Sequence, residues 1–263
     1  MSKEKSFKIY DKDIYYYDSG KGDVVILLHG YLETKEVWSD LSNRLSNNFR
    51  VISIDIPGHG KSEVLDSTHS MELLAKAINS LLDYLNIKQC SLIGHSMGGY
   101  ITLAFAELFP DKLKSFILLH SSVYADNDIK KENRLNDIKL IEQGELKKIT
   151  DSNIPKMFAN DNLSAFSNNI YIMQKYAQKF DTDGVVALIK GMMNRTDKQN
   201  FIRTFNKPML FIFGKKDNFI SIDVAKEMLK LNSNIEYKIL NNSGHMGFIE
   251  EAEEVVDIIK RFI

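Results

Sequence analysis

The sequence predicts an α/β protein in which helices cover both faces of a mostly parallel sheet. Two observations support this fold class. Short apolar runs, typical of strands buried on both faces, alternate with stretches of helical periodicity over most of the 263 residues. One long segment, residues 123–206, interrupts this alternation, because it lacks convincing strands and is rich in Asn, Lys and Asp. These patterns indicate one large domain with a helical insertion.

Local patterns place the individual elements. Alternating apolar and polar residues at 7–10 and 14–17, joined by the turn at 11–13, predict an antiparallel hairpin at one edge of the sheet. The apolar runs predict further strands at residues 24–28, 49–54, 90–93, 115–119, 208–213 and 235–240. Apolar residues at helical spacing predict core helices at residues 37–45, 71–85, 97–108 and 247–262. Strands that alternate with helices in this way are joined by right-handed crossovers and run parallel.

Residues 123–206 are expected to form a helical cap over the carboxyl edge of the sheet, between core segments 1–122 and 207–263. Helical periodicity in the cap spans residues 129–141, 163–180 and 185–193. Most of its apolar side chains would hold the cap together, and one or two would line a substrate pocket, with Met157 and Phe158 as candidates. Several cations could attract an acidic substrate, but a solvated helix face is the favoured interpretation: Lys130, Lys131, Arg134, Lys147 and Lys148.

Composition narrows the class of partner. The chain is 44% hydrophobic and 26% charged, and its net charge of −1 gives no electrostatic reason to bind nucleic acid or an anionic membrane. No apolar run is long enough to span a bilayer, and the first residues lack the apolar core of a secretion signal. Cys90 is the only cysteine, so no intrachain disulfide can form. We expect a cytoplasmic protein that acts on a small molecule, while its oligomeric state stays open.

The most informative motif is the run GHSMGG at residues 94–99, between a strand pattern and a helical pattern. Ser96 would stand on a sharp strand-to-helix turn, where glycine two residues before and two after relieves crowding. This turn lifts the hydroxyl out of the sheet. It also places the Met97 N–H at a helix N-terminus, which favours negative charge. Taken alone, Ser96 could equally be the N-cap of the helix.

A serine hydroxyl is a poor nucleophile unless a base takes its proton and an acid orients that base. Asp217 follows the apolar run at 208–213, and His245 lies in a glycine-flanked loop after the strand predicted at 235–240. The chain order serine, acid, histidine suits a catalytic triad. The alternatives are that Asp217 caps the next helix and that His245 is a loop residue exposed to water.

The run HGY at residues 29–31 closes the strand predicted at 24–28. Gly30 lets the chain turn away at the carboxyl edge of the sheet, where open α/β sheets place their ligands. The Tyr31 amide would then point at the same space as the Met97 amide, and two such donors stabilise a developing oxyanion. His29 is expected to be a structural hydrogen-bonding residue. The glycine-rich run at 55–62 fits neither dinucleotide nor phosphate-loop spacing and is expected to be a rigid loop.

Position separates His245 from the other histidines. His95 is next to the serine, where side chains on a sharp turn diverge, so local packing is expected. His69 begins a predicted helix and is expected to be solvated. His120 follows a predicted strand and could contact substrate, although a structural role is favoured. Met246, beside the candidate base, is a further candidate for the pocket.

These motifs together resemble those of the α/β-hydrolase superfamily, in its compact, carboxylesterase-like subgroup with a helical cap. The matching runs occur in the family's order: HGY at 29–31, DIPGHGKS at 55–62, GHSMGG at 94–99, Gly214-x-x-Asp217 and Gly244-His245. Relatives that open epoxides or remove halogens carry aspartate at the nucleophile position, where this chain has Ser96.

The resemblance implies an eight-stranded, mostly parallel sheet and a reaction without cofactor or metal. It also implies a triad of Ser96, Asp217 and His245, with oxyanion amides from Tyr31 and Met97. We therefore expect hydrolysis of small to medium, apolar carboxylic esters through an acyl-enzyme.

Two alternative functions stay open. The same triad could serve carbon–carbon bond hydrolysis, elimination or peracid formation. In relatives, carbon–carbon cleavage usually needs a carboxylate-binding cation in the cap, for which Arg134, Arg195 and Arg203 are available. The other alternative is a ligand-binding module with vestigial turnover.

Overall fold

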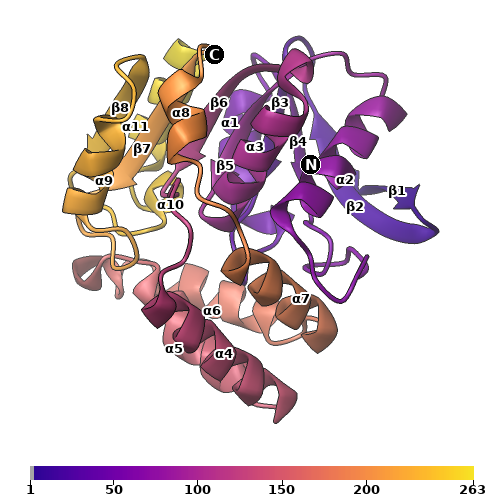
Figure 1. Ribbon diagram of the computed structural model, residues 1–263, viewed down its shortest axis with the longest axis vertical. Helices are drawn as coiled ribbons and strands as arrows, with labels where there is room; N and C mark the ends of the chain where they lie inside the picture. The colour runs from indigo at the N-terminus through magenta and orange to yellow at the C-terminus, as the bar shows by residue number, and fades with distance from the viewer. Residues whose placement is uncertain (1–2) are drawn as a thin grey trace.

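The computed structural model describes residues 3–263 (Figure 1). Eight strands form one sheet in the order β1-β2-β4-β3-β5-β6-β7-β8. The hairpin of β1 (Lys5–Ile9) and β2 (Lys12–Ser19) is antiparallel and joins the sheet through an antiparallel β2–β4 pair. The other pairs are parallel, and their strands are β3 (Val24–Leu28), β4 (Arg50–Ile54), β5 (Cys90–His95), β6 (Leu113–Leu119), β7 (Met209–Gly214) and β8 (Ile235–Leu240). The predicted hairpin and the mostly parallel eight-stranded sheet are confirmed.

The central strands form the core of the molecule. Strands β5 and β7 are buried over their whole length, and β3 and β4 are buried except at their first residue. Continuous apolar runs suit this position, because both faces of a parallel sheet are covered by helices. The parallel strands end at one edge of the sheet, so the loops that follow them converge there.

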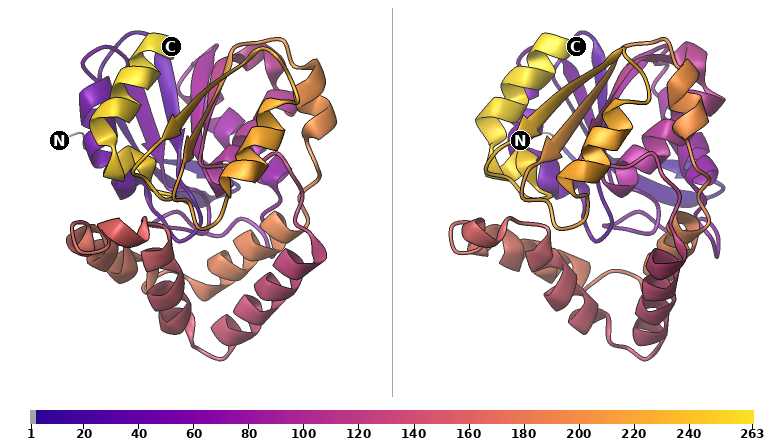
Figure 2. Two further views of the ribbon diagram at one scale, coloured as in Figure 1. Left: turned by 90° about the vertical axis from the view of Figure 1, so that its left-hand side faces the viewer. Right: turned by 60° about the vertical axis from the view of Figure 1, so that its left-hand side comes forward.

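Helices cover both faces of the sheet (Figure 2). On one face, α1 (Ser39–Leu45) contacts α11 (Ala252–Phe262). On the other, α2 (Met71–Tyr84) packs against α3 (Met97–Leu108). A further helix, α9 (Ile222–Leu229), contacts β7. Ser70 caps α2 by accepting a hydrogen bond from the Leu73 amide, as serine does at helix N-termini.

Residues 123–206 contain five helices: α4 (Asp128–Glu142), α5 (Leu146–Lys156), α6 (Ser167–Ala177), α7 (Thr182–Met193) and α8 (Gln199–Thr204). Helices α4 to α7 lie together beyond the carboxyl ends of β7 and β8. Helix α8 lies beside the sheet (Figures 1 and 2). Helix α4 contacts both α5 and α7, and α5 also contacts α6.

Helix α7 approaches the core at two glycines. A Cβ atom on Gly184 would lie 2.4 Å from the Gly58 carbonyl oxygen, and one on Gly191 would lie 1.7 Å from the His69 carbonyl oxygen. Neither position has room for a larger residue. This contact explains why His69 is fully buried, contrary to the expectation that it is solvated. Its Nε2 atom accepts the Leu65 amide at 3.0 Å.

Several helix boundaries differ from the prediction. The expected helix at 247–262 is split into α10 (Gly247–Glu250) and α11, because Glu251 leaves helical geometry and accepts hydrogen bonds from the loop residues Asn242 and Ser243. The first predicted core helix begins as a 3₁₀ turn, Lys35–Trp38. Helix α6 is shorter than the predicted 163–180. Helices α5 and α8 were not predicted, since α5 contains a polar run and Pro155.

Within residues 3–263, no helix combines the length and apolar character needed to cross a membrane.

Candidate active site

Ser96 stands on the predicted turn between β5 and α3. Its backbone has φ 50° and ψ −114°, a conformation that costs non-glycine residues about 1–3 kcal/mol. Close packing enforces the turn, because a Cβ on Gly94 would lie 2.4 Å from the Gly98 carbonyl oxygen and one on Gly98 would lie 2.1 Å from the Leu28 carbonyl oxygen. Ser96 occupies the N-cap position of α3, but its side chain makes no capping hydrogen bond to that helix.

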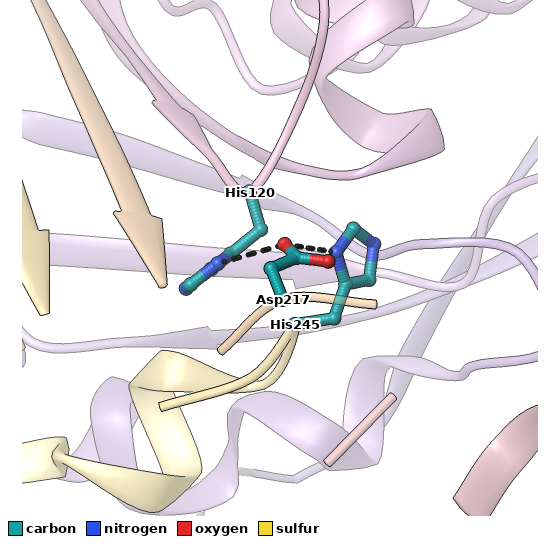
Figure 3. Close-up of side chains that lie close together, drawn as sticks. All are labelled: His120, Asp217 and His245. Carbon is teal, nitrogen blue, oxygen red and sulfur yellow. Dashed lines mark hydrogen bonds and ion pairs between the residues drawn. The ribbon is translucent and has the colours of Figure 1, made fainter. Parts of the chain in front are cut away.

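Asp217 and His245 meet at the carboxyl edge of the sheet, from the loops after β7 and β8 (Figure 3). The Nδ1 atom of His245 lies 2.7 Å from the Asp217 Oδ2 atom, and both side chains are buried. The other carboxylate oxygen accepts the Phe219 amide at 2.7 Å and the Ile220 amide at 3.1 Å. Burial alone would raise the pKa of Asp217, but the neighbouring imidazoles outweigh it and hold this pKa well below its usual range. Asp217 is therefore ionised at neutral pH.

The hydrogen bond to Asp217 fixes how His245 is presented. With Nδ1 facing the carboxylate, Nε2 is the atom left to act as a base. Ser96 and His245 line the same cavity, although no hydrogen bond joins their side chains within residues 3–263. Catalytic hydrogen bonds are often loose in a ligand-free enzyme and tighten when substrate binds.

His120 lies on the other side of Asp217 (Figure 3). Its Nε2 accepts the Gly247 amide at 3.1 Å, which leaves the proton on Nδ1, 3.4 Å from the Asp217 carboxylate. Burial lowers the pKa of His120 to about 4, so the ring is neutral at pH 7. His120, Asp217 and His245 have the spacing of metal ligands. However, the Nδ1 atom that would bind a metal is the one that carries the proton, so the set fits a hydrogen-bonded cluster better than a metal site.

Tyr31 follows β3 and lines the same cavity as Ser96, and Met97 is the first residue of α3, directly after Ser96. The neighbouring amides in the 29–33 loop are already used, because Gly30 donates to the Glu33 carboxylate at 2.7 Å and Leu32 donates to His59 Nε2 at 3.0 Å. Among residues 3–263, no hydrogen bond occupies the amide of Tyr31 or Met97. Both donors are free for a ligand.

His29 and His95 are buried, and so is the loop at 55–62 except at Gly60 and Lys61. His29 accepts the Ile56 amide at 3.0 Å and contacts the Gly30 carbonyl, so the expected structural role agrees with its contacts. His95 lies below the site, where its Nε2 is 2.8 Å from the carbonyl oxygen of His245.

The cavity that contains Ser96 and His245 has a volume of about 530 Å³. Its apolar wall includes Met157, Met192, Phe219 and Ile220. Much of its polar wall comes from α4, and it includes two of the cations for which a solvated helix face was the favoured interpretation: Lys130, Asn133, Arg134, Asn136 and Asp137. A second cavity, of about 580 Å³, lies between α6 and residues 32–44 and contains no member of the proposed triad.

Of the four pocket residues named from the sequence, Met157 lines the cavity. The other three, His120, Phe158 and Met246, are fully buried behind the cavity wall. Hydrophobic periodicity could not separate them, since a buried wall and the layer behind it have the same composition. Tyr100 and Ser122 also line the cavity and carried no sequence signal.

Comparisons with known proteins identify the fold family. A family model described as "alpha/beta hydrolase fold" matches residues 23–252. A 2-hydroxy-6-oxononadienedioate/2-hydroxy-6-oxononatrienedioate hydrolase of Dechloromonas aromatica is 26% identical over 96% of this chain and 91% of its own length. A hydrolase of the same description from Paraburkholderia phymatum is 26% identical over 95% of this chain and 90% of its own length.

Solved structures share the fold. A thermophilic esterase from Thermogutta terrifontis, solved with malate bound, superposes with a TM-score of 0.92 at 24% identity, covering 99% of this chain and 97% of that one. An enol-lactonase from Burkholderia xenovorans has a TM-score of 0.91 at 19% identity, covering 98% and 99%.

Proposed function

This chain belongs to the alpha/beta hydrolase fold family and is an enzyme, and we propose that it hydrolyses carboxylic esters through Ser96, His245 and Asp217. The observation that carries the proposal is the 2.7 Å contact between His245 and a buried Asp217, at a cavity shared with a serine held in strained geometry.

Each side chain has one role in the proposed reaction. His245 Nε2 takes the Ser96 proton as the hydroxyl attacks the ester carbonyl, and Asp217 stabilises the resulting imidazolium through Nδ1–H. The negative charge that develops on the carbonyl oxygen is met by the Tyr31 and Met97 amides. His245 then returns the proton to the leaving alcohol. Water releases the acid from Ser96 by the same steps, with His245 again as the base.

A labelling experiment tests the proposal. A fluorophosphonate probe is expected to label Ser96, and a series of p-nitrophenyl esters of increasing acyl length should be hydrolysed with a clear optimum. Labelling should disappear in Ser96→Ala. A protein that is not labelled at any pH at which it stays folded would instead support the ligand-binding module.

Carbon–carbon bond hydrolysis is the second candidate, because the cavity holds a suitable cation and the similar hydrolases of D. aromatica and P. phymatum are named for dioate substrates. Of the three cap arginines, Arg134 alone lines the cavity. Arg195 is buried, where it donates to the Tyr124 carbonyl at 2.8 Å and the Met192 carbonyl at 2.7 Å. Arg203 is exposed on α8.

The partners of Arg134 leave it able to bind an anion. Its Nε pairs with Asp126, whose other oxygen lies 2.7 Å from Arg195, so two guanidinium groups share one carboxylate. The terminal nitrogens of Arg134 donate no hydrogen bond within residues 3–263. The buried Tyr31 hydroxyl also lacks a partner in that part of the chain. These donors would suit a substrate carboxylate, which revises the expectation of a purely apolar substrate.

A paired-substrate assay tests Arg134. We expect p-nitrophenyl hemiglutarate to be preferred over p-nitrophenyl valerate, and the ratio of their kcat/KM values to fall at least tenfold in Arg134→Gln. Asp126 keeps Arg195 in this variant, so the buried carboxylate remains paired. Lys131→Gln removes the same charge from an exposed position on α4 and should change the ratio less than twofold. Equal falls for both esters in Arg134→Gln would contradict a carboxylate subsite.

Cleavage of a vinylogous diketone that carries a carboxylate separates the two reactions. Release of the dienol product at a rate comparable to ester hydrolysis would establish carbon–carbon cleavage. Hydrolysis of esters with no such release would exclude it.

A further inference from the structure

His95 has a hydrogen-bond acceptor at each ring nitrogen. Its Nε2 lies 2.8 Å from the His245 carbonyl oxygen, and its Nδ1 lies 2.9 Å from the Glu33 Oε1 atom. A carbonyl oxygen can only accept, so Nε2 must carry a proton. Both side chains are fully buried, so neither nitrogen faces bulk solvent.

The second proton lies between His95 and Glu33. The other oxygen of Glu33 accepts the Gly30 amide at 2.7 Å, and His95 Nδ1 is 3.1 Å from that oxygen as well. The pair is therefore either an imidazolium with a carboxylate or a neutral imidazole with a carboxylic acid. Burial alone would lower the pKa of His95 and raise that of Glu33, but their mutual attraction reverses both shifts. The geometry points the same way, because Nδ1 lies within 3.1 Å of both Glu33 oxygens and one of these oxygens also accepts an amide, as suits a carboxylate beside a ring with two protons.

Other buried histidines of the site region have a different pattern. His29 accepts an amide at Nε2 and contacts the Gly30 carbonyl at Nδ1. His59 accepts the Leu32 amide at Nε2 and contacts the Gly58 carbonyl at Nδ1. One acceptor and one donor nitrogen make a neutral ring. Burial lowers the pKa of His59 to about 3, in agreement with this pattern.

The pair connects two parts of the site that lie far apart in the sequence. Glu33 holds the turn that presents the Tyr31 amide, through its bond to Gly30. His95 holds the backbone of His245, and it is itself the residue before Ser96. The other titratable groups near the pair are His245 and His120, whose rings lie 4.9 and 6.0 Å from the His95 ring, Asp217 beyond them, and His29 on the Glu33 side. The apolar rings of Trp38 and Phe248 also pack against His95.

We propose that Glu33 and His95 are positioning residues: a buried ion pair that fixes the catalytic histidine relative to the oxyanion amides. Neither residue touches the reacting atoms. The effect of these two residues on the reaction rate depends on the proposed triad being correct. The charge of His95 does not depend on it.

Nuclear magnetic resonance measures the charge directly. With ¹⁵N-labelled histidine at pH 7, both His95 nitrogens are expected to show imidazolium shifts, while His29 and His59 each show one protonated and one unprotonated nitrogen. An unprotonated Nδ1 on His95 would overturn the ion pair. This result is independent of whether Ser96 reacts with a fluorophosphonate, so a failed triad and a failed ion pair are distinguishable.

Variants of Glu33 test the positioning role. Glu33→Ala removes the link and should lower kcat about a hundredfold with KM changed less than threefold, since displacement of a catalytic group by about 1 Å costs this much. Glu33→Gln should restore most of the rate, because its amide can accept from Gly30 and donate to a neutral His95. A Glu33→Ala enzyme that is folded and retains wild-type kcat would overturn the proposal.

The pH profile supplies a readout that a purely structural contact would not change. The pKa of His95 is raised in the folded protein. The stabilisation that the ion pair gives to the site is therefore fully present below the ordinary histidine pKa, about 6.5, and is lost as the pH rises through the pKa of His95 in the folded protein. The kcat of the wild type should therefore fall as the pH rises. The kcat of Glu33→Gln should not, since the glutamine amide and a neutral His95 carry no charge at any pH in the profile. Glu36→Gln, the same change three residues away, should keep the alkaline loss. If Glu33→Ala does not fold, an unchanged alkaline limb in Glu33→Gln would still refute the proposal.

Discussion

Ser96→Ala is expected to lower kcat by about 10⁶-fold while leaving the fold intact. The loss is large because the proposed reaction forms its covalent bond at this oxygen, and no other hydroxyl can occupy the same turn. The fold should persist, since the Ser96 side chain makes no capping hydrogen bond and alanine is no more strained than serine at φ 50°. The free energy of unfolding should change by less than about 0.5 kcal/mol.

Steady-state kinetics on a p-nitrophenyl ester and chemical denaturation measure these two quantities. Ser80→Ala, on the exposed side of α2, is a matched control that should keep full activity. Activity of Ser96→Ala within tenfold of the wild type would refute the proposed nucleophile.

Asp217→Asn is expected to lower kcat by about 10⁴-fold, less than the serine change. Asparagine can still accept the Phe219 and Ile220 amides, so the loop should keep its shape. Its NH₂ group, however, would donate to His245 Nδ1 and force the ring proton onto Nε2. That tautomer cannot take the proton from Ser96, and the imidazolium formed in the wild type would lose its counter-charge.

The pH dependence of stability provides an independent check on Asp217. Because its pKa is depressed, the Asp217–His245 pair stabilises the protein above the ordinary aspartate pKa, about 3.9, and this contribution is lost as pH falls through the folded value. Asp217→Asn should lack that part of the acid transition. Asp223→Asn, at an exposed position on α9, should retain it together with full activity. Wild-type kcat in Asp217→Asn would show that another group orients His245.

The sequence predicted best those features that depend on neighbouring residues or on the order of strands in the sheet. Apolar runs located the parallel strands, and glycines two residues either side of Ser96 located the turn, because close packing admits nothing larger there. The sequence alone pairs Asp217 with His245, since loops after parallel strands meet at one edge of the sheet. The contact between them agrees with that reasoning.

Contacts between segments that are far apart in the sequence could not be predicted in this way. His69 looked solvated because nothing in its own segment shows that α7 packs onto its backbone. Glu33 carried no signal, although it pairs with His95 across 62 positions. For Lys130 and Arg134 a solvated face was favoured over a role at the substrate for a similar reason: a helix such as α4, with few buried residues, gives no periodicity that shows which polar side faces a ligand.

The cap is attached to the core at a few points, and these points determine which parts of the cavity can change in sequence. Two of its segments are anchored by backbone contacts too close for a side chain: α7, against residues 58 and 69, and residues 157–159, against Gly244. Helix α4 spans the space between these anchors and contacts mainly α5 and α7. The wall of the cavity that α4 supplies can therefore accept new residues while the reacting groups keep their positions. Enzymes built on this scaffold could acquire different substrates by altering a single helix, without a cost to the chemistry beneath it.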